Sequence, residues 1–476
     1  MMRLEYDMVV IGGGAAGLTS AGMSALLGAK TALIERGRLG GECTWTGCIP
    51  SKALLGAARA AQQIRTADRF GLASTEPEIV FARVMEHVRS VRQHVYEEAD
   101  APPNMERLGV EVVPGSARFL DPHTVEVTDG SGTRRLRSRF FVIATGSRPK
   151  KPEFAEPALT NESLFELTER PRRLLVLGAG PVGIEMAQAF RRLGSEVVVV
   201  APGEGILRRD DPAHAAILRD CLAREGVKFR FGRRVTGVEQ GKARLDNGEV
   251  LACDAVLAAT GRRPSVDGLQ LEKAGVRVGE KGVGIDTRCR TSQRHIYAAG
   301  DVTGRHQFTH MAEHMAKVAV TNALLRWPKS LDEKHVVWCT FTDPELATLG
   351  ESEEDLRRRG AKYGVFRLPF DRLDRAITEG ETAGEIKVFG DPAGRILGAS
   401  IVGAQAGEMI SHYALAMRNH IRMQNISDTV HPYPTFTLGN RRVADQFGAR
   451  QLDSPLLGLL GKVLRYRGTR KGSAAL

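Results

Sequence analysis

The sequence predicts an α/β fold, with two Rossmann-like, three-layer nucleotide-binding domains followed by a C-terminal α+β domain. Three observations lead to this prediction. An apolar strand, a glycine turn and a helix follow one another twice, at residues 7–17 and 173–183. A chain of 476 residues is too long for one ordinary core. Short apolar strands return near residues 336–340, 365–370 and 386–389, which indicates a third packed unit.

The first glycine turn follows the apolar strand that starts at Asp7. In a GxGxxG turn the first glycine permits the tight turn. The second lets the backbone approach a pyrophosphate, and the third lets the helix pack on the strand. The phosphates then face a helix N-terminus, whose free N–H groups favour anions. Eighteen residues past the turn, Glu35 ends the next strand, placed to accept hydrogen bonds from an adenosine ribose. The turn glycines are Gly12, Gly14 and Gly17.

The second turn repeats this pattern with one informative difference. Eighteen residues past it stands Ala201, so this site lacks the carboxylate that selects the 2′-hydroxyl of NAD. Downstream, Arg208 and Arg209 could contact a 2′-phosphate, although two arginines in a loop could also be solvated charges. The pattern favours NADPH, with NADH as the alternative. The turn glycines are Gly178, Gly180 and Gly183.

A close cysteine pair, Cys43 and Cys48, lies just ahead of an Ala/Leu-rich helix expected over residues 53–64. A thiol at a helix N-terminus has a lowered pKa, which supplies the thiolate that disulfide exchange and metal binding need. Pro50 suits a first helical turn. On their own, the two cysteines could equally be buried small residues or half of a metal site, although no further ligands follow at zinc-site spacing. The other cysteines are dispersed, and we expect them to be buried structural residues: Cys221, Cys253, Cys289 and Cys339.

Composition excludes several classes of protein. The net charge of +11 is spread along the chain, which suits acidic ligands such as nucleotides, and no nucleic-acid-binding motif accompanies it. Six cysteines are too few for a secreted disulfide scaffold. The sequence enters a strand almost at once without a signal peptide, and it has no apolar run long enough to span a membrane. We therefore expect a cytoplasmic protein with no nucleic-acid partner.

The order of motifs resembles the class I pyridine nucleotide-disulfide oxidoreductases, which include dihydrolipoyl dehydrogenase, glutathione reductase and mercuric reductase. The run Gly41-x-Cys43-x-x-x-Gly47-Cys48-x-Pro50-Ser51-Lys52 is similar to the redox motif of that family. The resemblance extends in order over roughly residues 5–450, through ATG-type turns, a Gly-Asp motif and the start of a dimerisation domain. These further motifs are Ala144–Pro149, Ala259–Pro264, Tyr297–Asp301 and Thr342–Ala347.

The resemblance implies FAD and NAD(P)H as cofactors. Electrons would pass from nicotinamide to flavin and on to a Cys43–Cys48 disulfide, with Cys48 against the flavin and Cys43 meeting the substrate. Lys52 and Glu185 would pair beside the flavin; an exposed helix lysine and a helix-face glutamate are the alternatives. The remaining implied contacts are Thr145, Gly146 and Asp301 to FAD, and Gly261 to NAD(P).

The chain departs from the dithiol enzymes near its C-terminus. Where their motif has a basic histidine and an orienting glutamate, this sequence has Tyr433 and Leu438, and His431 comes two residues early. Tyrosine, with an ordinary pKa near 10, is a poor base at neutral pH. Tyr433 and Trp45 place the chain nearest the mercuric reductase-like branch, although it lacks that branch's vicinal cysteine pair near the C-terminus.

The expected domains are an FAD-binding domain, an NAD(P)-binding domain, a return to the FAD-binding domain, an α+β dimerisation domain and a basic tail. The resemblance implies a homodimer. The tail resembles a short amphipathic helix, which could dock on the protein or lie peripherally on the inner face of a membrane. The ranges are 1–150 for the FAD-binding domain, 151–270 for the NAD(P)-binding domain, 271–330 for the return to the FAD-binding domain, 335–450 for the dimerisation domain and 451–476 for the tail.

The predicted activity is NAD(P)H-dependent transfer of electrons through the cysteine pair to a small-molecule acceptor, either a disulfide or a thiophilic metal ion. Two alternatives stay open because the base is missing. One is a dehydrogenase that reduces a quinone at the membrane surface. The other is a non-catalytic flavoprotein that senses redox state.

Overall fold

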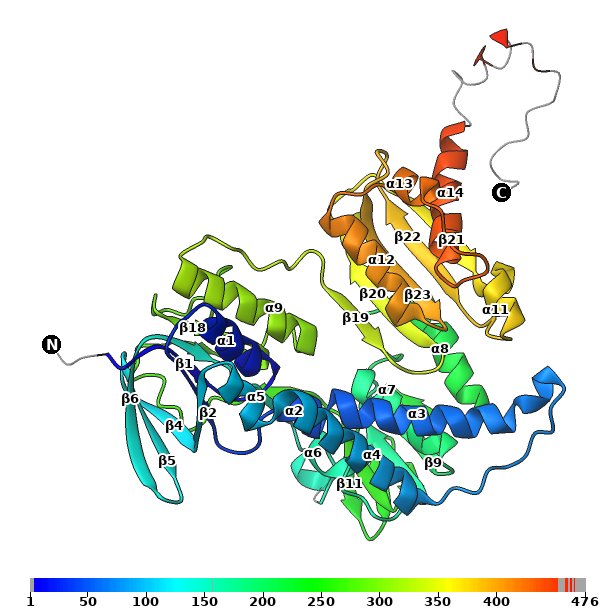
Figure 1. Cartoon of the computed structure of the whole chain (residues 1–476). Coiled ribbons are helices and arrows are strands. Elements are labelled where there is room, and N and C mark those ends of the chain that lie inside the picture. Colours follow the sequence, from blue (N-terminus) through cyan, green and yellow to red (C-terminus); the bar gives the residue numbers. More distant parts are fainter. Residues whose placement is uncertain (1–3, 156, 453–458, 461–462, 465, 467–476) are drawn as a thin grey trace.

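Three large β-sheets organise the chain, and Figure 1 shows them as three groups of strands joined by helices. The computed structural model describes residues 4–155, 157–452, 459–460, 463–464 and 466. The predicted α/β fold, with two nucleotide-binding sheets and a C-terminal α+β domain, is confirmed. The amphipathic helix predicted within 451–476 lies almost wholly outside the described residues.

The first sheet has a parallel core in the strand order β3-β2-β1-β6-β18. The apolar run that starts at Asp7 is buried, because helices cover one face of this sheet and β-structure covers the other. Helices α1 (Ala15–Leu26) and α9 (Thr309–Val320) lie side by side on that face (Figure 1). The strands are β1 (Tyr6–Ile11), β2 (Thr31–Glu35), β3 (Val110–Pro114), β4 (Ser116–Asp121), β5 (Thr124–Asp129), β6 (Gly132–Ile143) and β18 (Ile296–Ala298).

Helices between β2 and β3 carry the cysteine pair. The helix predicted over residues 53–64 is longer than expected, because α3 begins at Cys48 and runs to Arg65. Gly47 precedes its first residue, and Pro50 is tolerated because the first-turn N–H groups have no partner within the helix. Cys48 is therefore the first helical residue. The other helices here are α2 (Gly41–Trp45), α4 (Phe81–Val95) and α5 (Pro102–Arg107).

The second sheet is parallel, in the order β10-β9-β8-β14, and repeats the strand–turn–helix arrangement of the first. A Cβ at Gly183 would overlap the carbonyl oxygen of Gly178, so α7 packs closely on β8. The elements are β8 (Arg173–Leu177), α7 (Pro181–Arg192), β9 (Glu196–Ala201), α8 (Pro212–Arg224), β10 (Lys228–Phe231) and β14 (Ala255–Ala258), with an antiparallel sheet of β11 (Val235–Glu239), β12 (Lys242–Leu245) and β13 (Val250–Ala252).

The chain crosses between the two nucleotide sheets twice, and the two crossings are hydrogen-bonded to each other. Strand β7 (Ser147–Pro149) enters the second unit and pairs antiparallel with β15 (Arg262–Pro264), which leaves it. This pairing holds the two sheets together beside the site. Short elements nearby are α6 (Asn161–Leu164), β16 (Val278–Gly279) and β17 (Gly282–Val283).

The C-terminal sheet is antiparallel, in the order β19-β20-β23-β22-β21, and its core includes the fully buried Tyr413 and Phe370. Figure 1 shows α12 and α14 against this sheet. The elements are β19 (Val337–Thr340), β20 (Glu345–Gly350), α10 (Glu353–Arg358), β21 (Gly364–Pro369), α11 (Asp374–Thr378), β22 (Glu385–Gly390), β23 (Ile396–Gly403), α12 (Ala406–Arg418), α13 (Met423–Asp428) and α14 (Leu438–Leu452). Within the described part of the chain, no helix has the length and apolar character needed to cross a membrane.

Buried charges join the second nucleotide unit to the C-terminal sheet. Lys387 Nζ lies 2.5 Å from Asp211 Oδ2 and 3.2 Å from Glu353 Oε2, and its side chain is only 4% exposed. His214, fully buried on α8, lies with Nδ1 2.8 Å from Ser400 Oγ on β23. Removing one partner of the Lys387 ion pair would leave an uncompensated buried charge. The ion pair and the His214–Ser400 contact therefore fix α8 on the C-terminal sheet.

Candidate active site

One cavity of about 1560 Å³ collects most of the residues that the sequence predicts for the site. It opens at the carboxyl ends of β1 and β8, the edge at which parallel sheets bind ligands. The predicted residues that line it are Gly12, Gly14, Glu35, Cys43, Cys48, Lys52, Thr145, Gly146, Gly180, Glu185, Arg208, Gly261 and Asp301. Those that do not line it are Gly17, Gly178, Gly183, His431 and Tyr433.

The first glycine turn leaves the N-terminus of α1 open to the cavity. Gly12 has φ +105°, and a Cβ at Gly17 would overlap the carbonyl oxygen of Gly12. Glu35 accepts hydrogen bonds from the Gly13 N–H at 2.6 Å and the Gly37 N–H at 2.8 Å, which fixes its carboxylate at the end of β2. The tight turn, the free helix end and the carboxylate are arranged as a dinucleotide needs them.

The second glycine turn has the same geometry. Gly178 has φ +106°, and a Cβ at Gly180 or Gly261 would meet open space, so both leave room for a ligand. Where the first site has Glu35, this one has the buried Ala201. Beyond it Arg208 and Arg209 are exposed, line the cavity and form no salt bridge with a described carboxylate; they are available to an anion.

The cysteine pair lies on the cavity wall as two thiols, Cys43 in α2 and Cys48 at the start of α3. The hydrogen bond that Cys43 donates lowers the pKa of Cys48 to about 6, with help from Thr309 and Lys52 and against the effect of burial. The same hydrogen bond, together with burial, raises the pKa of Cys43. At neutral pH Cys48 is therefore a thiolate and Cys43 a protonated thiol.

The predicted pairing of Lys52 with Glu185 is present: Lys52 Nζ lies 3.0 Å from Glu185 Oε2. The glutamate side chain is only 7% exposed, and its other oxygen accepts a hydrogen bond from the Phe341 N–H at 2.9 Å. Lys52 Nζ also lies 4.4 Å from the centre of the Phe341 ring. The pair therefore joins α3, α7 and the strand region after β19 at one point of the cavity.

Three residues of the site were not predicted from the sequence: Thr309, Glu42 and Arg262. Thr309, the first residue of α9, has its Oγ1 3.2 Å from Cys48 Sγ. Glu42 forms an ion pair with Arg262, and burial raises the pKa of Glu42 to about 7 against the effect of that arginine. The sequence gives a signal for two of them, because Glu42 directly precedes Cys43 and Arg262 lies within the Ala259–Pro264 turn.

Asp301 lies where the two nucleotide units meet. Its Oδ2 accepts a hydrogen bond from Ser147 Oγ at 2.6 Å and lies 3.6 Å from Arg262 Nε. Burial raises the pKa of Asp301 above its ordinary value. The carboxyl group therefore faces the cavity from a largely desolvated position, anchored by β7 and β15.

The expectation that the remaining cysteines are buried holds for three of them and is wrong for Cys339. Cys221, Cys253 and Cys289 are buried, but Cys339 is half-buried and lines the cavity. Burial raises the pKa of the Cys339 thiol, so it is protonated at neutral pH. The exposure arises because β19 is the edge strand of its sheet.

The C-terminal segment stands apart from the cavity of its own chain. Tyr433 is 71% exposed, and a hydrogen bond with Asp374 raises its pKa further above the ordinary value. His431 Nδ1 lies 2.8 Å from the Thr429 carbonyl oxygen, and Leu438 is buried at the start of α14. No imidazole base from this segment faces the cysteine pair within the described chain.

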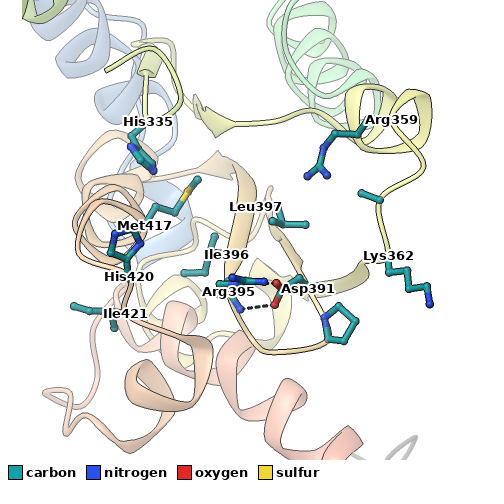
Figure 2. Close-up of a pocket in the computed structure, with 12 residues that line it drawn as sticks. His335, Arg359, Lys362, Asp391, Arg395, Ile396, Leu397, Met417, His420 and Ile421 are labelled. Carbon is teal, nitrogen blue, oxygen red and sulfur yellow. Dashed lines mark hydrogen bonds and ion pairs between the residues drawn. The ribbon is translucent and has the colours of Figure 1, made fainter. Parts of the chain in front are cut away.

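A second cavity, of about 470 Å³, lies in the C-terminal domain away from the cysteines. Figure 2 shows His335, Met417 and His420 on one side of it and Arg359 on the other. Its arginines already have carboxylate partners: Arg359 pairs with Glu351, and Arg395 with Asp391. The chemistry of the predicted site therefore belongs to the larger cavity.

Comparison with known proteins agrees with this geometry. Residues 6–316 match the family described as pyridine nucleotide-disulphide oxidoreductase, and residues 336–441 match the dimerisation domain of that name. The chain is 35% identical over 455 residues to a dihydrolipoyl dehydrogenase of Thermus scotoductus, a match that covers 92% of this chain and 97% of that protein. It is 34% identical over 460 residues to a mercuric reductase of Lysinibacillus sphaericus, covering 93% and 83%.

A solved structure gives the same picture. The Cu(II) complex of the HOCl-induced flavoprotein disulfide reductase RclA from Escherichia coli matches with a TM-score of 0.82 at 27% identity. The match covers 93% of this chain and 99% of that one.

Proposed function

The chain belongs to the pyridine nucleotide-disulphide oxidoreductases, and from this premise we propose that it reduces thiophilic metal ions with NADPH through Cys43 and Cys48. The family uses FAD and NAD(P)H, which confirms the predicted cofactors. Its members are oxidoreductase enzymes, so the alternative of a non-catalytic sensor is set aside. The dimerisation domain supports a homodimer.

The observation that carries the proposal is the unequal pair of thiols on the cavity wall. FAD, when bound, supplies the carrier that passes an electron pair from the nicotinamide to the cysteine pair. The reduced pair, the Cys48 thiolate with the Cys43 thiol, then gives one electron to each of two Cu(II) ions, forming the disulfide and releasing one proton and two Cu(I) ions. The hydride equivalent from NADPH, two electrons and one proton, restores the thiolate and the thiol. The sum is NADPH plus two Cu(II) giving NADP⁺, two Cu(I) and one proton.

The missing base favours a metal ion over a disulfide as the acceptor. Exchange with a disulfide needs a group that protonates the departing thiolate, and Tyr433, with its raised pKa, is unsuited to this role. A thiophilic metal ion binds thiolate directly and needs no such proton transfer. Relatives named mercuric reductase and a relative solved with Cu(II) support this choice.

The proposed cofactor contacts follow from the two turns. Gly12, Gly14 and the N-terminus of α1 receive the FAD pyrophosphate, and Glu35 its adenosine ribose. Asp301, with Thr145 and Gly146 on the neighbouring turn, holds the middle of FAD. The Lys52–Glu185 pair lies beside the electron-transfer path and sets the charge near Cys48.

For the second nucleotide we propose NADPH, with Arg208 as a ligand of its 2′-phosphate. Replacing Arg208 by Ala removes a charge-assisted contact of about 1.5–3 kcal/mol, so we expect KM for NADPH to rise roughly tenfold to a hundredfold. KM for NADH should stay the same in Arg208→Ala. The control is Arg233→Ala, which removes an exposed arginine that does not line the cavity and should change neither the KM for NADPH nor the KM for NADH. Equal rises in both KM values for Arg208→Ala would contradict the assignment.

The activity is tested by following NADPH oxidation by the purified, FAD-loaded protein with Cu(II), Hg(II), lipoamide, glutathione disulfide and a quinone. We expect turnover with the metal ions, lost in Cys43→Ser and in Cys48→Ser but kept in Cys221→Ser, which alters a buried cysteine outside the cavity. Turnover with disulfides alone would show a dithiol reductase instead. Quinone turnover that survives Cys43→Ser would favour the quinone alternative.

A further inference from the structure

The edge of the first sheet opposite the cavity carries a group of exposed apolar side chains. Parallel strands all begin at one edge, and helices such as α1 and α9 that return from the other edge also end there. Trp327 is 70% exposed just after α9, and Leu26 is 73% exposed at the end of α1. The complete group, called here the apolar edge, is Leu4, Leu26, Leu27, Leu108, Leu325 and Trp327.

Two parts of the apolar edge are tied to packed structure, the one at Leu108 and the one at Trp327. Leu108, before β3, lies against Gly22 of α1. The loop after α9 is fastened by Asn322, whose side chain donates to the Lys329 carbonyl oxygen at 2.7 Å, and by the Lys329 N–H, which donates to the Trp327 carbonyl oxygen at 2.8 Å. The loop folded in this way leaves the Trp327 indole in solvent. These contacts fix the apolar edge at Leu108 and at Trp327.

Basic side chains outnumber acidic ones around the apolar edge. The register of β6 against β1 and β18 places Arg139 and Arg294 at the same edge, beside Lys30. Exposed bases at the ends of these elements are Lys30, Arg107, Arg139, Arg294, Arg326 and Lys329. The acids in corresponding positions are Glu5, Asp7, Glu106 and Glu111. The bases outnumber these acids, so the rim around the leucines and the tryptophan is positive.

We propose that the apolar edge is a docking surface for an anionic lipid bilayer. Tryptophan prefers the interface between headgroups and acyl chains, leucines enter the acyl boundary, and lysines and arginines are drawn to anionic headgroups. The cavity lies at the other edge of the same sheet, so docking would leave it open. The inference is independent of the acceptor proposed above, because it concerns where the enzyme works and not what it reduces.

The test is flotation of the FAD-loaded protein with vesicles of phosphatidylcholine alone or mixed with phosphatidylglycerol. We expect binding to the anionic vesicles and at least a tenfold weaker binding of the triple variant Leu26→Ser, Leu27→Ser, Trp327→Ser. The matched control is Val250→Ser on β13, which removes an apolar side chain of 49% exposure from the second unit. Its binding should equal that of the wild type, and all variants should keep their FAD and their NADPH oxidation rate.

Three results would overturn the proposal. The first is no binding of the wild type to anionic vesicles. The second is a triple variant that binds as well as the wild type while charge reversal in the tail, Lys462→Glu with Arg465→Glu and Arg467→Glu, abolishes binding. The third is a wild type that forms assemblies larger than a dimer without lipid, by sedimentation velocity, and loses them in the triple variant. That result would make the apolar edge a contact between copies of the chain.

Discussion

At the scale of single residues, the site works through a difference between two chemically identical side chains. Cys48 begins α3, where free N–H groups favour negative charge, and it accepts a hydrogen bond from Cys43. Lys52 lies one turn further along the same helix and favours the thiolate, whereas Glu185 opposes it. The charges of this ion pair therefore act on Cys48 with opposite signs.

The reactivity of Cys48 should follow a pKa of about 6. Alkylation of the reduced protein by iodoacetamide, mapped by mass spectrometry, should fall off below that pH, because only the thiolate reacts. Lys52→Met removes a nearby positive charge and should move the midpoint to higher pH. Glu185→Gln removes a negative charge and should move it to lower pH. A midpoint near the ordinary cysteine value of about 8.5 in all three proteins would contradict this account.

The structure places Cys43, Cys48 and Lys52 on one cavity wall, and the sequence could indicate them together because they belong to one local motif. The cysteines, Lys52 and the turn glycines are fixed by spacing along one segment. Thr309 was missed because its contact with Cys48 spans 261 residues and depends on how α9 packs. Cys339 was misjudged for a similar reason, because edge-strand position is a property of the sheet and not of the local sequence.

At the scale of elements, the cysteine loop is held directly against the first glycine turn. Gly41 has φ +57°, and a Cβ there would lie 2.6 Å from Gly14 Cα. The predicted helix start was wrong by five residues, because the Ala/Leu-rich pattern begins at Ala53 while the backbone becomes helical at Cys48. The error matters chemically, since the earlier start places the thiol in the first turn.

Gly41→Ala should separate the cysteine loop from the first glycine turn. The added Cβ meets backbone, and its φ disfavours any L-residue, so we expect a loss of more than about 1 kcal/mol in the free energy of unfolding. The FAD content of the purified protein, read from its visible absorbance, should fall as well. Gly56→Ala is the matched control: Gly56 lies inside α3 with open space around it, and this change should stabilise the protein by about 0.5–1 kcal/mol. Equal effects of the two substitutions would refute the proposed contact.

At the scale of the whole molecule, the loop proposed to bind the NADPH phosphate is anchored to the C-terminal domain. Asp210 follows Arg209 directly and accepts hydrogen bonds from Trp338 Nε1 at 2.8 Å and Thr348 Oγ1 at 2.7 Å. Asp211 then pairs with the buried Lys387. The repeated glycine turn predicted both nucleotide units, but these contacts between domains depend on surfaces that meet only after folding.

Lys387→Met should destabilise the protein by about 3–5 kcal/mol in urea unfolding at pH 7, because Asp211 and Glu353 lose their buried cation. Burial tends to raise the pKa of Asp211, but Lys387 and His214 more than offset this and lower it. The pair therefore stabilises the fold above the ordinary aspartate pKa of about 3.9, and this contribution is lost as pH falls through the lowered value. In Lys387→Met, stability should depend less on pH in that acid range; an unchanged acid dependence would contradict this assignment.

The pairing of β7 with β15 has an evolutionary consequence. The Lys150 N–H donates to the Gly261 carbonyl oxygen at 2.9 Å, so the entrance and exit of the second nucleotide unit are neighbours. A unit with adjacent ends can be grafted through two neighbouring joints, provided that its Asp211 and His214 still meet their partners on the C-terminal sheet. Such an exchange would replace the nicotinamide site together with Glu185, whereas its partner Lys52 and the cysteine pair would stay with the first unit.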